Sequence, residues 1–268
     1  MDEVTPRLAC GLGNRMFQMV AAIRVAEQIG AEPILLLPTM SRGEHGNFKT
    51  FLTLFPNIRI VETAREWTEV REEKDGSLPP LNKCPITVIS GFFQNTDYFP
   101  SLSNTYLPSL PSTISLTNRW AIHFRFGDYQ ILPHYHIGLG KYYYKTIREN
   151  IPHNSNICLF SDSPGRLPAI VSELQGFGYS VEIYENSDTI ETFKAFASCS
   201  AGSICSNSTF AWWAAYFAWR QNGPLYKAFF PDKWIINHET RLFTLPFTQS
   251  VKLDEISAVS SLNSFSHY

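Results

Sequence analysis

The sequence predicts an α/β fold of two Rossmann-like domains, each built on a mostly parallel sheet. Two observations predict it: short apolar runs alternate with segments of helical periodicity, and a Ser-, Pro- and Thr-rich segment, residues 101–118, separates two such series. We therefore expect domains at residues 1–115 and 116–250 that face a cleft, followed by a Ser-rich tail at residues 251–268.

Six short apolar runs predict buried strands. They are Ile34–Leu37, Ile86–Ile89, Trp120–Phe124, Ile157–Phe160, Val181–Tyr184 and Ser203–Cys205. The apolar residues between Met16 and Ile29 keep to one broad helical face, and Gly30 is expected to end that helix. Further helices are expected at Lys141–Asn150, Leu167–Gln175 and Asp188–Ala197.

The composition is that of a folded globular protein. The chain has 268 residues, of which 44% are hydrophobic and 17% charged, and its net charge is −2, so general binding of nucleic acid is not expected. The N-terminus carries no apolar signal segment, and the longest apolar run, Phe210–Trp219, is much shorter than the ~20 residues of a membrane span. We expect a cytoplasmic protein without a transmembrane segment, in which the five cysteines are free, buried thiols.

A glycine-rich motif comes directly before the first helix. It consists of Gly11, Gly13 and Asn14, and two glycines allow a tight turn at a helix N-terminus, where backbone N–H groups favour anions. The dinucleotide-binding fingerprint is incomplete, because Met16 occupies the position of its next glycine, and no Walker lysine follows. The motif is therefore either an anion-binding loop or an ordinary strand–helix turn.

A second polar motif runs from His123 to Tyr129, at the end of an expected strand. His123 and Arg125 stand at alternating positions and so share one face of that strand. Ligands of open α/β sheets bind at the carboxyl ends of the strands, and the planar guanidinium suits phosphate because it forms two parallel charge-assisted bonds. The alternative is a structural ion pair between Arg125 and Asp128.

A third motif is a hydroxyl-rich turn between an expected strand and the buried helix near Phe210. Its residues are Ser206, Asn207, Ser208 and Thr209. Their hydroxyl groups and the first amides of the helix can hold a phosphate, and the alternative is an ordinary N-cap. Asn207 also begins a glycosylation sequon, whose use we do not expect in a buried turn.

A carboxylate follows another expected strand. Asp162 can accept hydrogen bonds from guanine N–H groups or ribose hydroxyls, or it can cap a helix before Pro164. Metal or hydrolase chemistry is not indicated, because the chain has no D-x-D pair and no G-x-S-x-G motif, and His134 and His136 have no evident third ligand.

Together and in this order, the motifs resemble those of the α-1,2-fucosyltransferase family, within the α-1,2/α-1,6/protein-O-fucosyltransferase superfamily. The family's G-L-G-N-Q-M-F-Q stretch corresponds to Gly11–Gln18, its H-x-R-R-G-D-Y motif to His123–Tyr129, and its S-N-S-S-F-S-W-W motif to Ser206–Trp213. The chain departs from the pattern at Arg15, where Gln is usual, and at Phe126, which replaces the second arginine.

The resemblance implies an inverting glycosyltransferase of GT-B type that uses GDP-fucose and an acceptor glycan and requires no metal or other cofactor. The acceptor side would be the N-terminal domain, with Gly13 and Asn14 at the donor, and the C-terminal domain would hold most of the nucleotide sugar. Arg125 would contact the β-phosphate and His123 the nucleotide. The pyrophosphate would lie on Ser206, Asn207, Ser208 and Thr209, and the guanosine on Asp162.

The physical demands of the reaction agree with this assignment. Breaking the sugar–phosphate bond leaves negative charge on GDP, which fixed cations and amide dipoles stabilise in the absence of a metal. Arg125 and the helix start near Ser208 would supply both. Asp128 is the first candidate for the general base, with His134 or His136 behind it, although Asp128 can instead orient Arg125 and the reaction can proceed without a base.

Two other functions remain open at this stage. Phe126 in place of arginine leaves room for another nucleotide-sugar donor, and a non-catalytic module that binds GDP-sugars or glycans would need the same polar turns. Loops that shape the acceptor side are expected at Ser41–Lys49 and Glu66–Asp75, where a charged run is otherwise a solvated face.

Overall fold

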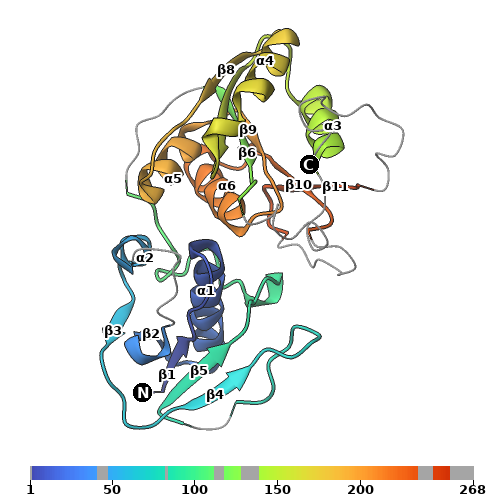
Figure 1. Cartoon of the computed structure of the whole chain (residues 1–268). Coiled ribbons are helices and arrows are strands. Elements are labelled where there is room, and N and C mark those ends of the chain that lie inside the picture. Colours follow the sequence, from blue (N-terminus) through green and yellow to red (C-terminus); the bar gives the residue numbers. More distant parts are fainter. Residues whose placement is uncertain are drawn as a thin grey trace. The chain divides into compact units, whose positions relative to one another are not determined.

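The structure is a computed structural model that describes residues 2–40, 48–81, 84–111, 118–127, 139–234 and 244–253. The chain forms two compact units, an N-terminal unit with the described residues up to Pro111 and a C-terminal unit with those from Asn118 onward (Figure 1). Each unit contains one sheet of parallel strands with helices, so the predicted α/β class is confirmed.

The N-terminal unit has a five-stranded parallel sheet in the order β3-β2-β1-β5-β4 over its described residues. Its elements are β1 (Glu3–Pro6), α1 (Leu12–Ile29), β2 (Glu32–Leu36), η1 (Leu37–Thr39), α2 (Phe48–Leu54), β3 (Arg59–Val61), β4 (Thr68–Arg71), β5 (Ile86–Ser90) and η2 (Thr96–Tyr98). The chain winds outward from β1 to β3 and then returns to place β5 on the other side of β1. The junction of β1 and β5 is therefore the topological switch point of this sheet.

Helix α1 follows β1 directly and packs on β1 and β2 (Figure 1). Its apolar residues from Met16 to Ala26 are buried, and it ends at Gly30, whose φ of 68° is in the left-handed region that terminates helices. The helix predicted over Met16–Ile29 and its end at Gly30 are confirmed.

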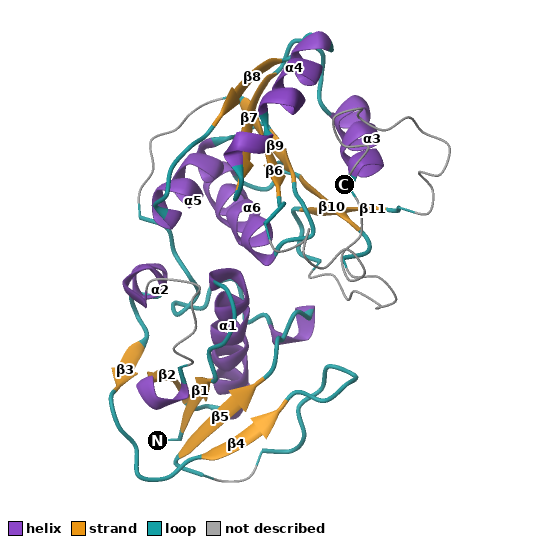
Figure 2. Cartoon of the chain, in the orientation of Figure 1, coloured by secondary structure: helices purple, strands orange, loops and turns teal. Residues whose placement is uncertain are grey.

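The C-terminal unit has a six-stranded parallel sheet in the order β11-β10-β9-β6-β7-β8 over its described residues. Its elements are β6 (Arg119–Phe124), α3 (Gly140–Asn150), β7 (Asn156–Ser161), η4 (Pro164–Arg166), α4 (Pro168–Gly176), β8 (Ser180–Ile183), α5 (Thr189–Ser198), β9 (Gly202–Ile204), α6 (Thr209–Asn222), β10 (Ala228–Pro231) and β11 (Thr248–Val251). Figure 2 shows α3 and α4 on one face of this sheet and α5 and α6 on the other. The winding direction reverses between β6 and β9, which makes their junction the switch point of this unit.

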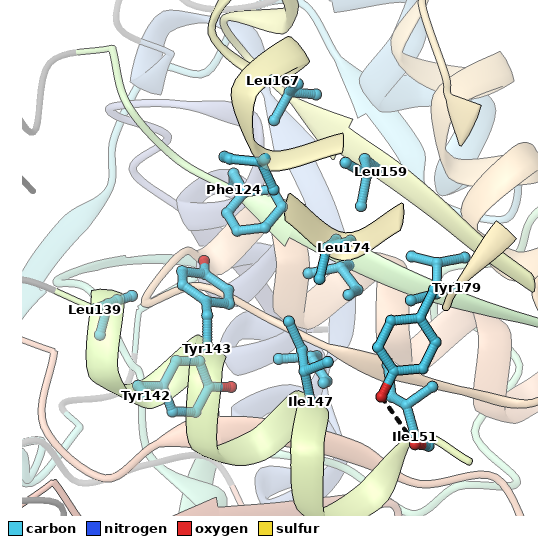
Figure 3. Close-up of a cluster of buried hydrophobic side chains, with 14 of the residues drawn as sticks. Phe124, Leu139, Tyr142, Tyr143, Ile147, Ile151, Leu159, Leu167, Leu174 and Tyr179 are labelled. Atoms are coloured by element: carbon cyan, nitrogen blue, oxygen red, sulfur yellow. Dashed lines mark hydrogen bonds between the residues drawn. The ribbon is translucent and has the colours of Figure 1, made fainter. Parts of the chain in front are cut away.

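The core of the C-terminal unit fixes the strands that carry the polar motifs. On one face, tyrosines and aliphatic residues of α3 and α4 pack on Phe124 of β6 and Leu159 of β7 (Figure 3). On the other face α6 is buried along most of its length, and the ring of Phe193 on α5 stacks on that of Phe210 at 4.5 Å between centroids. Because both faces are covered, β6 is buried from Ala121 to Phe124 and β7 from Ile157 to Phe160.

All six predicted strands and the predicted helices are present, with ends shifted by no more than four residues. The predicted loop at Glu66–Asp75 is wrong in part, because Thr68–Arg71 forms the edge strand β4. The expected Ser-rich tail begins inside β11, which ends at Val251. Residues 41–47 of the other predicted loop lie outside the described residues.

All five cysteines are free, as expected, but only Cys158, Cys199 and Cys205 are buried, whereas Cys84 is partly exposed and Cys10 is exposed. No helix among the described residues combines the length and the apolar character needed to cross a lipid bilayer.

Candidate functional site

Two of the predicted motifs meet at the switch point of the C-terminal unit. Strands β6 and β9 are paired with Ile122 opposite Ile204, so His123 and Ser206 follow at neighbouring carboxyl ends. The Nδ1 atom of His123 lies 2.8 Å from the Ser206 hydroxyl oxygen, and both side chains are buried. This hydrogen bond joins the second motif to the third at the edge of the sheet where ligands of such folds bind.

His123 is held as a neutral imidazole. Only 4% of the residue is exposed, and this burial lowers its pKa to about 4, with nearby Asp162 acting in the opposite direction and Arg125 in the same one. A neutral ring has one donor and one acceptor nitrogen, so Nδ1 and the Ser206 hydroxyl share one proton, and Nε2 takes the complementary role.

Arg125 is paired with Asp162, across the β6–β7 junction. Its Nη1 lies 3.0 Å from Asp162 Oδ2, and the two carboxylate oxygens accept hydrogen bonds from the backbone N–H groups of Phe126 at 2.9 Å and Gly127 at 3.0 Å. The interpretation of Asp162 as a helix cap before Pro164 is wrong, since η4 begins without a side-chain cap. The carboxylate instead fixes the turn after β6 and orients the guanidinium.

Gly127 makes room for this carboxylate. A Cβ atom at residue 127 would lie 2.5 Å from Asp162 Oδ2, which is closer than two nonbonded atoms come. The glycine of the H-x-R-x-G-D-Y motif is therefore explained by the approach of Asp162 to the backbone.

The third motif forms a buried turn that leads into α6. Ser206, Asn207 and Ser208 are buried, Asn207 Nδ2 donates to the carbonyl oxygen of Trp234 at 2.8 Å, and the N–H of Ser208 donates to the Ser206 carbonyl oxygen at 2.8 Å. Ser208 occupies the N-cap position, but its hydroxyl makes no capping hydrogen bond, so the ordinary N-cap interpretation is wrong. Thr209 is the first residue of the helix, whose first-turn amides point toward this turn.

Two tyrosines of α3 form hydrogen bonds with the backbone at the carboxyl ends of β6 and β9. The Tyr143 hydroxyl donates to the carbonyl oxygen of His123 at 2.7 Å, and the Tyr142 hydroxyl donates to the carbonyl oxygen of Cys205 at 2.8 Å. Burial raises the pKa of Tyr142 well above its ordinary value, so it stays a neutral donor. The residues before Ser206 and at His123 are therefore held in place by the same helix.

The replacement of the second arginine by Phe126 has a structural explanation. Its ring is buried, stacks on Phe124 at 6.1 Å between centroids, and is covered by the guanidinium of Arg166 at 5.1 Å. Residue 126 is thus part of the core, and η4 brings a different cation to its ring. No pattern in the sequence singles out Arg166, which lies 40 positions away in the chain.

The first motif lies at the switch point of the N-terminal unit. Asn14 Oδ1 accepts a hydrogen bond from Gln94 Nε2 at 3.0 Å. Gln18 accepts from the N–H of Ala9 at 2.9 Å and donates to the carbonyl oxygen of Gly91 at 2.9 Å, which ties the ends of β1 and β5 together. Gly13 is buried in the first turn of α1.

The predicted site residues therefore form two groups. His123, Arg125, Asp162 and the turn from Ser206 to Thr209 gather at the end of one sheet, and Gly13 and Asn14 lie at the end of the other. Asp128, His134 and His136 lie outside the described residues. Within the described residues, no three His, Cys, Asp or Glu side chains are grouped closely enough to hold a metal ion.

Known proteins resemble this chain along most of its length. An α-1,2-colitosyltransferase from Escherichia coli is 27% identical over 286 aligned residues, covering 91% of this chain and 96% of that protein. This similarity confirms the resemblance to α-1,2-glycosyltransferases that the motifs indicated. A mutant of Arabidopsis thaliana FUT1 in complex with GDP aligns with 85% of this chain and 70% of its own, at a TM-score of 0.45 and 11% identity. No protein-family model matches the chain.

Proposed function

We propose that this protein is an inverting, metal-independent glycosyltransferase that moves L-fucose from GDP-fucose to a hydroxyl group of an acceptor glycan, with α-1,2 linkage. The hydrogen bond between His123 and Ser206 carries the proposal, because it joins two polar motifs at a switch point and leaves the start of α6 beside them. The α-1,2-transferase relative that spans nearly the whole chain supports it.

In this proposal the C-terminal unit stabilises the departing diphosphate. Arg125 contacts the β-phosphate, and the first amides of α6 with the hydroxyls of Ser208 and Thr209 receive the remaining oxygens. Asp162 fixes Arg125 in position, which makes the cation preorganised rather than recruited during the reaction. Charge that develops on the leaving group is then stabilised without a metal ion.

The remaining donor contacts follow the same arrangement. Neutral His123 presents a polar nitrogen to the nucleotide, and Asp162 accepts from the guanosine with the acceptor capacity left after its two amide bonds and its ion pair with Arg125. Gly13 and Asn14 contribute from the N-terminal unit. The Asn14 amide is oriented for this by its bond to Gln94, which leaves its NH₂ group as the donor.

Inversion requires the acceptor hydroxyl to attack from the face opposite the leaving group. Asp128 is the proposed general base, with His134 and His136 as the alternatives. An essential base sets the acidic limb of the pH–rate profile, so Asp128→Asn should abolish that limb along with most of the activity. An unchanged profile would assign Asp128 to the orientation of Arg125.

A second candidate is the transfer of a colitosyl group, favoured by the name of the E. coli relative. The test is a screen of nucleotide sugars against acceptor glycans, with the product identified by mass and linkage. GDP, but not UDP or ADP, should raise the melting temperature, and EDTA should leave the transfer rate unchanged. Binding of GDP without transfer to any acceptor would instead support a non-catalytic binding module.

A further inference from the structure

Arg15 stands at the start of α1, at the switch point of the N-terminal unit. It is 96% buried, with 4% of its surface exposed. Side chains of a helix tilt toward its N-terminus, so Arg15 extends from the end of the first turn toward the loop after β1. This is the edge of the sheet where the carboxyl ends of β1 and β5 meet.

The guanidinium has no protein partner among the described residues. Its Nε and Nη2 atoms are buried without a hydrogen bond, and no carboxylate of the described chain forms an ion pair with it. Burial lowers the pKa of Arg15, while its electrostatic interaction with Cys10 acts in the opposite direction. An arginine nevertheless stays charged at neutral pH, so Arg15 is a buried cation without a counter-charge in the part of the chain that the structure describes.

The polar side chains of Asn14 and Gln18, on the same helix, form hydrogen bonds with other residues. The Asn14 side-chain oxygen is bound to Gln94, and the Gln18 amide is bound at both ends, to Ala9 and Gly91. These bonds make the loop rigid without reaching the guanidinium. An unpaired buried charge is costly, and it persists where a ligand supplies the counter-charge.

We infer that Arg15 and the first turn of α1 form a binding site for a phosphate or carboxylate oxyanion of a substrate. The helix dipole and the guanidinium act together there, and Cys10, which interacts electrostatically with Arg15, is exposed. The assignment to a substrate rests on the proposed function. The oxyanion belongs either to the donor diphosphate or to an acidic sugar of the acceptor.

The first test measures stability with inorganic pyrophosphate in an Arg125→Ala background, which removes the cation of the C-terminal site. Arg15→Met is expected to raise the melting temperature of the ligand-free protein by about 2–4 °C, because it removes an unpaired charge. Pyrophosphate should stabilise the background protein, and Arg15→Met should weaken that binding about 10- to 100-fold.

The matched control is Arg24→Met on the same helix. Arg24 is paired with Glu27 at 2.8 Å and is partly exposed, so its loss should leave pyrophosphate binding unchanged. Equal pyrophosphate binding by the Arg15→Met and background proteins, or no binding of pyrophosphate or glucuronate by the background protein, would overturn the inference. A lower melting temperature of Arg15→Met without ligand would do so too, since it would assign Arg15 a structural role.

Calorimetry on the otherwise wild-type chain then separates the two sources. If the oxyanion is the donor's, Arg15→Met weakens GDP but not guanosine; if it is the acceptor's, the variant weakens glucuronate and leaves GDP unchanged. Unchanged binding of all three would overturn the inference. The proposed function can fail independently, because a protein that binds pyrophosphate through Arg15 but shows no GDP binding and no transfer retains the anion site and loses only the enzymatic assignment.

Discussion

The two units share one structural feature, a helix that begins at the switch point of a sheet, but the polar side chains there are bonded differently. In each, a helix begins beside the switch point of a parallel sheet, α1 after β1 and α6 after β9. At α6 the polar groups are bonded to one another: His123 to Ser206, and Arg125 to Asp162. At α1 the side-chain amides are bonded, but the cation, Arg15, has no bonded partner within the described ranges.

At α6 the protein itself fixes the geometry of the polar groups. At α1 the charge of Arg15 is available to be neutralised by a ligand. Preorganised groups favour a reaction in which charge develops, because no reorganisation is needed at the moment of bond cleavage. An unpaired buried cation favours recognition of an existing anion, because the ligand removes the cost of desolvation. We therefore expect catalysis to depend on the C-terminal unit and selection of an anion on the N-terminal unit.

The largest effect is expected at Arg125. Arg125→Ala should lower kcat by about 10²–10³, the usual loss for one preorganised donor to a developing oxyanion, and Arg125→Lys should also be poor because a point charge does not replace the planar fork. Single-turnover transfer from GDP-fucose measures it. The control is Arg148→Ala, an exposed arginine of the same unit; activity of Arg125→Ala within a few-fold of wild type would exclude the role.

The next effect concerns pH and stability. The folded pKa of His123, about 4, lies below the ordinary value near 6.5, so the unfolded chain binds a proton first as the pH falls. The free energy of unfolding should therefore decrease between pH 6.5 and pH 4, by about 3 kcal/mol from this residue. Above pH 6.5 this residue should contribute no slope.

Urea denaturation across that range measures the slope. His123→Gln should flatten it, whereas His153→Gln, which replaces an exposed histidine of the same unit, should leave it as in the wild type. Equal slopes in wild type and His123→Gln would mean that the buried imidazole is protonated as readily as a free one, and would contradict the neutral His123–Ser206 pair.

Gly127 offers a smaller effect on the same site. In Gly127→Ala the new methyl group displaces the Asp162 carboxylate, so the Arg125 guanidinium loses its fixed position. We expect transfer to fall about 10- to 50-fold, a loss of about 2 kcal/mol and less than when the cation itself is removed. Gly165→Ala is the control, since a Cβ at Gly165 meets no atom within 4 Å; equal activity of the two variants would refute the role of Asp162.

Local patterns were sufficient for the elements with strong signals. The run before Phe124 and the helix after Ser208 are apolar and long, so strand and helix follow from them. Strands β1, β3, β4, β10 and β11 were not predicted, because each has only three or four residues and its neighbours in the sheet make it a strand. The sequence therefore predicted the fold class better than it predicted the number of strands in each sheet.

The site shows the same limit. The approach of His123 to Ser206 follows from motifs at two strand ends, but which strand ends are neighbours depends on the strand order. The pair of Arg125 and Asp162 needed the register of β6 against β7, and the sequence offered Asp128 as the nearer partner. The burial of Arg15 depends on tertiary packing. Arginine in place of the family's usual glutamine replaces one polar residue with another, so the sequence did not predict that the side chain is buried.

The smallest effect tests whether the hydrogen bond from Tyr143 to the end of β6 matters for transfer and not only for stability. Tyr143→Phe removes the hydroxyl that donates to the His123 carbonyl oxygen, and Tyr179→Phe removes one that donates to the Ile151 carbonyl oxygen at 3.3 Å, elsewhere in the same core (Figure 3). Each should cost about 1 kcal/mol of stability, the usual net contribution of one hydrogen bond. Only Tyr143→Phe should also slow transfer, by about 2- to 5-fold, because it loosens the strand end that presents His123 and Arg125. Denaturation and steady-state kinetics on both variants measure the two effects, and equal loss of activity in both would show that transfer depends on the stability of the core rather than on the position of that strand end.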